Sequence, residues 1–114
     1  MIRTTLATLI LAASVNATLA HSKPEDTTPA NNTTVEVVEV ISIRFNDPMR
    51  VTAIKIIGPD GTVGVDRVTG LEPVTEFLAA PTAIMPAGDY AVEWRGLSAD
   101  GHPMQGTFGF TVSE

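Results

Sequence analysis

The most constraining feature of this sequence is a series of short alternating segments separated by glycine- and proline-rich turns. Residues 90–95 and 107–112 each alternate apolar with polar or small residues at a period of two. That period is typical of half-buried β-strands, because successive side chains of a strand point to opposite faces. Beyond the first 20 residues, no long window shows the apolar period of a helix. The pattern therefore predicts an all-β domain.

The remaining strands are expected over residues 35–45, 51–57, 62–68, 74–79 and 82–85. The first of these strands is expected to end at Asn46-Asp47-Pro48. A strong turn signal, Gly58-Pro59-Asp60-Gly61, joins the strands over 51–57 and 62–68 and predicts a hairpin. A loop over 96–106 is expected to precede the last strand. Short strands joined by such turns favour an antiparallel β-sandwich or barrel, and residues 21–114 match the size of a seven-strand sandwich.

The first 20 residues have the features of a secretory signal peptide. Arg3 is the only charge there, residues 6–15 are apolar, and small residues follow. The apolar run is shorter than the roughly 20 residues that span a bilayer. Cleavage after Ala17 or after Ala20 satisfies the small-residue rule equally, and a buried or interfacial N-terminal helix is the alternative. We expect a signal peptide over 1–20, a domain over 21–114 and export of the mature chain.

Charge and cysteine content narrow the function further. Without Arg3, the chain holds six basic and thirteen acidic residues, a formal charge of −7. This balance disfavours nucleic acid and anionic lipid surfaces as partners and suits a cation, although the acids could equally serve solubility. Cysteine is absent, so the domain holds together by packing, and thiolate metal sites and cysteine nucleophiles are excluded.

The chain contains two histidines, and His21 directly follows the second cleavage point. A histidine at a mature N-terminus offers its α-amine and an imidazole nitrogen, which close a chelate ring on one metal ion. The α-amine has an ordinary pKa of about 7.7–8.0, so a metal ion displaces its proton at little cost near neutral pH. A histidine placed there by chance is the alternative. The metal-site interpretation requires cleavage after Ala20, because the same nitrogen is an amide in the precursor.

The second histidine lies in the sequence Ser98-Ala99-Asp100-Gly101-His102-Pro103. Pro103 biases His102 towards an extended conformation, in which Asp100 and His102 would face the same side about 7 Å apart. Gly101 between them would remove steric obstruction. The carboxylate could be a direct ligand or could orient the imidazole ring. The alternative is a turn with one solvent-facing histidine.

An amine, two imidazoles and a carboxylate form a nitrogen and oxygen donor set that suits Cu(II) better than Zn(II). A blue-copper site is excluded because it requires cysteine. Met49, Met85 and Met104 are scattered singly along the chain, and core or loop filling is their expected role. The sequence therefore predicts a Cu(II) site and no methionine-rich Cu(I) site.

The chain resembles the CopC family of periplasmic copper-binding proteins. The most specific matches are Pro86-Ala87-Gly88-Asp89-Tyr90, Trp94-Arg95, residues 98–103, and Gly106-Thr107-Phe108 with Phe110-Thr111-Val112. The resemblance implies an immunoglobulin-like (cupredoxin-like) sandwich that binds Cu(II) through an N-terminal histidine, an aspartate and a second histidine, here His21, Asp100 and His102. Some members carry Cu(I)-binding methionines in a loop that corresponds to residues 65–73. That segment has no methionine here, so the chain resembles the Cu(II)-only subgroup.

Three functions are compatible with these residues. The first is a monomeric periplasmic Cu(II) carrier or buffer, not inserted in the membrane, that hands copper to an inner-membrane permease of the CopD type, as the family resemblance suggests. The second is a copper oxygenase with a histidine brace formed by His21 and His102. A carboxylate ligand at Asp100 and a single Trp and Tyr argue against that enzyme. The third is a metal-free adaptor, which would gain support if the mature chain did not begin at His21.

Overall fold

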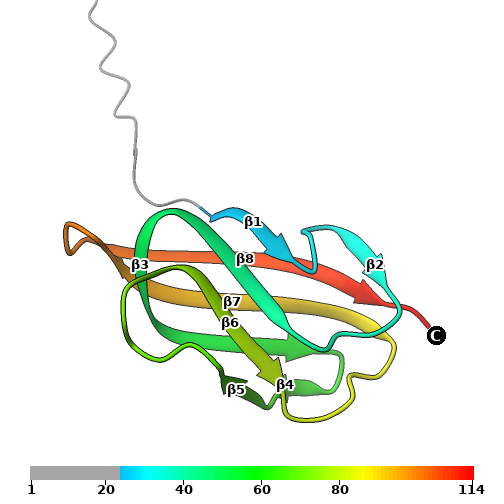
Figure 1. The fold of residues 1–114 in the computed structure, drawn as a ribbon. Helices are drawn as coiled ribbons and strands as arrows, with labels where there is room; N and C mark the ends of the chain where they lie inside the picture. Colours follow the sequence, from blue (N-terminus) through cyan, green and yellow to red (C-terminus); the bar gives the residue numbers. More distant parts are fainter. Residues whose placement is uncertain (1–23) are drawn as a thin grey trace, which may run out of the picture.

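The computed structural model describes residues 24–114, and His21 and the expected signal peptide lie outside the described residues. The described part is all-β, with eight strands (Figure 1). They are β1 (Pro24–Thr28), β2 (Thr33–Val35), β3 (Ile41–Gly58), β4 (Gly61–Val63), β5 (Val65–Arg67), β6 (Val74–Pro81), β7 (Gly88–Ser98) and β8 (Pro103–Val112). No helix within residues 24–114 is long and apolar enough to cross a membrane.

The strands form two layers, and the long strand β3 contributes to both of them because it changes partners along its length. Residues 41–45 pair with β1 and β6, whereas residues 49–57 pair with β7, and residues 56–58 also pair with β4. The β3–β6 register shifts between Arg44 and Met49, which includes the segment predicted to end a strand. Asn46-Asp47-Pro48 therefore marks a change of partner within one long strand. The prediction that a strand ends here was wrong, because β3 continues to Gly58. The irregularity indicated by this segment is present as a shift in the β3–β6 register.

The sheet order is β2-β8-β7-β3-β6-β5, with β1 and β4 attached to β3. All pairs are antiparallel except β2 and β8, which run parallel. The all-β class is confirmed, with eight strands where about seven were expected. The comparisons below confirm the fold type.

Several predicted strand boundaries need correction. The chain turns at Gly58-Pro59-Asp60-Gly61 as expected, but the returning strand is divided between β4, which pairs with β3, and β5, which pairs with β6. The predicted strand over 74–79 is present as β6, whereas residues 82–85 form no strand. The loop predicted over 96–106 is wrong, because β7 and β8 continue pairing as far as Leu97 and Pro103.

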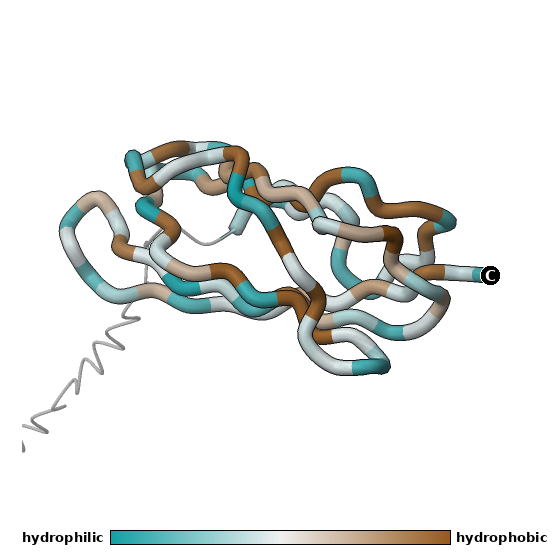
Figure 2. Tube along the Cα trace, turned by 90° about the horizontal axis from the view of Figure 1, so that it is seen from below, coloured by the Kyte–Doolittle hydropathy of each residue, from teal (hydrophilic) through white to brown (hydrophobic). Residues whose placement is uncertain are grey.

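The core lies between the two layers and contains the apolar residues of the predicted period-two segments. Figure 2 shows hydrophobic and hydrophilic residues alternating along the strands. Phe45 from β3 and Trp94 from β7 pack edge to face, with ring centroids 5.2 Å apart. Both side chains are buried, and so is Phe77 of β6. Trp94 is therefore a core aromatic residue.

The entry to β7 is a tyrosine corner. The Tyr90 hydroxyl donates a hydrogen bond to the carbonyl oxygen of Pro86, four residues earlier. The ring is buried and stacks on Phe110 with centroids 5.7 Å apart. This contact anchors the end of the β7–β8 hairpin that lies opposite its tight turn.

Candidate metal centre

The turn between β7 and β8 presents two of the three predicted metal ligands. The Ser98 N–H donates a hydrogen bond of 2.9 Å to the His102 carbonyl, and the Gly101 N–H donates one of 2.9 Å to the Ser98 carbonyl. These bonds close a compact turn at the end of a long, regular hairpin. Asp100 and His102 therefore occupy fixed positions relative to the sheet.

The side chains of Asp100 and His102 are in direct contact. Nδ1 of His102 lies 2.7 Å from Oδ2 of Asp100. The imidazole is 65% exposed and the carboxylate is 48% exposed, so both remain open to solvent. The structure thus brings the two predicted ligands together in a place that an ion can reach.

Ser98 is a member of this cluster whose role the sequence did not reveal. Its hydroxyl donates a hydrogen bond to Oδ1 of Asp100, and it also accepts a bond of 3.2 Å from the His102 N–H. Ser98 is buried, although it is polar. Its position two residues before Asp100 was visible in the sequence, but its inward direction depends on the strand register. Ser98 therefore holds the Asp100 carboxylate and the backbone of His102.

Hydrogen bonds hold Asp100 in its charged form. The pKa of Asp100 lies well below its ordinary value, first because the Ser98 hydroxyl donates to the carboxylate and next because the His102 side chain does so. Hydrogen bonds to an ionised carboxylate favour that form. A cation that binds here meets a carboxylate with no proton to displace.

The geometry that joins the two residues differs from the predicted one. An extended segment would place the side chains on one face about 7 Å apart, whereas residues 99–101 form a turn. Gly101 has a φ of 85°, in the left-handed region that favours glycine. A Cβ atom at Gly101 would meet nothing within 4 Å. The backbone conformation therefore favours glycine at this position, and the steric role expected of Gly101 between Asp100 and His102 stays a prediction.

The third predicted ligand, His21, lies outside the described residues. Strand β1 is antiparallel to β3, with Pro24 opposite Phe45. Met49, four residues further along β3, is opposite Ser98 at the base of the β7–β8 turn. The chain therefore enters β1 at the end of the domain that carries Asp100 and His102 (Figure 1). Within residues 24–114, no group of three or more His, Asp or Glu side chains is arranged to hold a metal ion.

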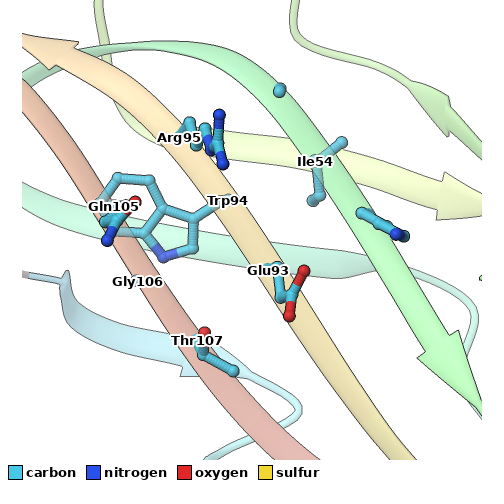
Figure 3. Close-up of a pocket in the computed structure, with 9 residues that line it drawn as sticks. Ile54, Glu93, Trp94, Arg95, Gln105, Gly106 and Thr107 are labelled. Atoms are coloured by element: carbon cyan, nitrogen blue, oxygen red, sulfur yellow. The ribbon is translucent and has the colours of Figure 1, made fainter.

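A groove of about 570 Å³ lies on the sheet surface formed by β3, β7 and β8 (Figure 3). Glu93 and Arg95 from β7 and Gln105 and Thr107 from β8 line it, together with Trp94 and Gly106. Neither Asp100 nor His102 belongs to its lining. The candidate metal ligands therefore sit on an exposed turn, away from this groove.

Comparison with known proteins decides the family. The profile of the CopC domain matches residues 24–113. The chain belongs to the CopC family. This family binds copper and is not enzymatic, so the expectation that the chain is no enzyme is confirmed and the oxygenase interpretation is set aside.

Individual CopC relatives agree in sequence and in fold. Copper resistance protein C of Escherichia coli is 28% identical over 105 residues, and the match covers 82% of each chain. The crystal structure of PcoC, a methionine-rich copper resistance protein from Escherichia coli, has a TM-score of 0.69 at 28% identity and covers 82% of this chain and 100% of its own. The crystal structure of CopC from Methylosinus trichosporium OB3b has a TM-score of 0.70 at 26% identity, over 82% and 94% of the two chains. The predicted fold and family are therefore confirmed.

Proposed function

We propose that this protein is a monomeric periplasmic carrier or buffer for Cu(II), which it binds through His21, Asp100 and His102. The observation that carries the proposal is the contact between Asp100 and His102 on an exposed turn. Family membership supplies copper as the cargo. His21 completes the donor set after removal of a signal peptide over residues 1–20.

The separation of the two side chains suits adjacent ligands of one ion. Two ligands at right angles, each about 2.0 Å from a metal, lie about 2.8 Å apart. The observed distance between Nδ1 of His102 and Oδ2 of Asp100 is 2.7 Å. The same distance is that of a hydrogen bond from the imidazole to the carboxylate, so the imidazole must lose this proton and the two side chains must turn before both atoms coordinate one Cu(II). The contact supports Asp100 as a ligand or as the group that orients His102.

The direction of β1 supports His21 as the remaining ligand. His21 precedes Pro24 by three positions, and an extended chain of that length reaches about 10 Å. Because β1 begins at the end of the domain that holds the β7–β8 turn, we infer that a chain of this length can extend to Asp100 and His102. The α-amine and imidazole of His21 would add two nitrogens and give the tetragonal set that Cu(II) prefers.

Family location and loop composition support the rest of the proposal. CopC proteins are periplasmic, which agrees with an exported chain. The segment 65–73 contains no methionine, so we place the chain in the subgroup that lacks a Cu(I)-binding loop. Its acidic charge suits attraction of a cation and disfavours nucleic acid. An inner-membrane permease of the CopD type is the proposed recipient of the copper.

The test begins with mass spectrometry of the exported protein, which we expect to start at His21. Chelator competition should then show one Cu(II) per chain. Adding one alanine before His21, or the substitution His21→Ala, should weaken Cu(II) binding by at least about 100-fold, because each removes the amine–imidazole chelate. A mature chain that begins at Thr18 would refute the proposed site. Sustained turnover of a chromogenic substrate with reductant and peroxide would reinstate the oxygenase.

A further inference from the structure

Most of the positive charge of the described residues lies on one face of the sheet. The full sequence holds 7 Lys and Arg residues against 13 Asp and Glu residues, and Arg3 and Lys23 precede the described part. Of the basic residues that remain, Arg50 and Lys55 of β3 and Arg95 of β7 are exposed on the outer face of β3, β7 and β8. A basic surface is therefore present on a chain that is acidic overall.

The strand register places these three cations beside one another. Lys55 lies opposite Glu93 in the β3–β7 ladder, and Arg50 lies opposite Leu97. A shift in the register between these two pairs keeps both on one face. Arg95 falls midway between the two β7 positions and points to the same side, because side chains alternate along a strand. Diagonal neighbours on a sheet are about 7–8 Å apart, so the cations form one continuous patch.

The groove of about 570 Å³ lies within this patch (Figure 3). Lys55 and Arg95 line it beside Glu93, and Gln105 and Thr107 of β8 add an amide and a hydroxyl group. Ammonium, guanidinium, amide and hydroxyl groups all donate hydrogen bonds, and the charged donors form the stronger bonds to carboxylates. The groove therefore offers several donors to an anionic occupant and a single carboxylate of its own.

The fold itself does not use the cations of the groove. Within the described residues, neither Lys55 nor Arg95 forms an ion pair, although Glu93 lines the same groove. By contrast, Arg44, which lies on the part of β3 that belongs to the other layer, pairs with Glu76 at 4.0 Å. The two cations of the groove are therefore available to carboxylates of another molecule.

We propose that this basic face docks an extended acidic segment of a partner protein. Lys55 and Arg95 pair with its carboxylates, and Gln105 and Thr107 donate hydrogen bonds to its oxygen atoms. Complementary charge favours such an encounter and selects against basic partners. Three strands at about 4.8 Å spacing span roughly 10 Å, a width that suits one extended chain. Arg50 continues the face to the base of the β7–β8 turn, so the docked partner lies next to the proposed copper ligands.

Two other occupants fit the charges less well. Two copies of this chain that met through the basic face would bring like charges together. A copy that presented acidic residues from elsewhere would leave its own basic face open and would continue into chains of molecules. An anionic membrane would attract the basic face but repel the 13 acidic residues of the chain. An acidic partner segment has neither conflict.

The test titrates the exported, copper-free protein with fluorescein-labelled hexaglutamate, with hexaglutamine as the neutral comparison. We expect binding of hexaglutamate alone, and we expect it to weaken as ionic strength rises. Amide NMR shifts should be confined to residues 50–55, 93–97 and 103–107. Lys55→Gln and Arg95→Gln should each weaken binding about threefold, because an exposed ion pair contributes modestly, and together about tenfold.

Arg44→Gln is the matched control, because it changes the net charge as much as Arg95→Gln does but lies on the other layer. It should bind hexaglutamate as the wild type does. Equal loss in Arg44→Gln and Arg95→Gln, or no binding by the wild type, would overturn the inference. Self-association in sedimentation that Arg95→Gln abolishes would assign the face to a second copy instead. Binding to phosphatidylglycerol vesicles in place of hexaglutamate would assign it to a membrane. Since no copper is present, failure here leaves the proposed Cu(II) site untouched.

Discussion

The indole ring of Trp94 lies directly against the backbone of Gly106, its cross-strand partner. A Cβ atom on Gly106 would lie 2.7 Å from Nε1 and 2.8 Å from Cε2 of the indole. Within the described residues the buried Nε1 atom has no hydrogen-bond partner. The absence of a side chain at Gly106 is therefore what allows the indole ring to pack against β8 and contact Phe45.

The first prediction concerns this contact. Gly106→Ala should destabilise the protein by about 1–3 kcal/mol, because the added methyl group overpacks a filled core position. Urea unfolding followed by Trp94 fluorescence measures the change. Gln105→Ala, at the exposed neighbouring position, is the control and should change stability by less than about 0.5 kcal/mol. Equal stability of both variants would show that the indole moves freely away from Gly106.

The second prediction concerns the tyrosine corner. Tyr90→Phe should cost about 1 kcal/mol, because it removes the hydrogen bond to Pro86 while keeping the stacked ring. Burial, followed by the charge of Asp60, raises the pKa of Tyr90, so the hydroxyl remains a donor at neutral pH. Thr111→Val removes an exposed hydrogen bond to Asp89 and serves as the comparison. Thermal unfolding should show the larger loss in Tyr90→Phe.

A third prediction addresses the carboxylate of the proposed copper site. Asp100→Asn keeps the shape of the side chain but removes its charge, and should weaken Cu(II) binding by about 10–100-fold. Chelator competition at neutral pH provides the measurement. As the control, Asp66→Asn removes an equal charge from an exposed position on β5 and should have little effect on Cu(II) binding. If both variants bind Cu(II) alike, Asp100 contributes only to the overall charge.

The fourth prediction concerns Ser98. Ser98→Ala should raise the pKa of Asp100 towards its ordinary value, because the serine hydroxyl is the largest cause of the lowered pKa. The pKa of Asp100 is expected to rise because the serine hydroxyl stabilises the charged carboxylate, and its removal takes that stabilisation away. NMR titration of the carboxyl carbon in the copper-free protein measures the shift. Ser113→Ala is the control, because it removes a serine hydroxyl that donates to the Val35 carbonyl, and it should leave the titration of Asp100 unchanged. An unchanged titration of Asp100 in Ser98→Ala would show that other contacts hold the carboxylate ionised.

The sequence was sufficient for features that depend on local pattern. The alternation in residues 90–95 and 107–112 identified β7 and β8, and the turn residues 58–61 located the β3–β4 hairpin. The pairing of Asp100 with His102 was visible because the two residues are close in the chain. Such features need no knowledge of distant strands.

Other features depend on which strands become neighbours. The loop over 96–106 was predicted too long because Gly96 and Gly106 resemble turn residues, although both pair within the hairpin and make room for Met49 and Trp94. The prediction for His21 remains a prediction, since it lies outside the described residues.

The position of β3 in both layers has a consequence for the proposed copper site. Pro24 is fixed opposite Phe45, and Ser98 is fixed opposite Met49. The four-residue step from Phe45 to Met49 therefore determines the distance between the entry to β1 and the base of the β7–β8 turn. If the proposed site forms, the length of Asn46-Asp47-Pro48, a segment with no proposed ligand, sets how far the entry to β1 lies from the β7–β8 turn.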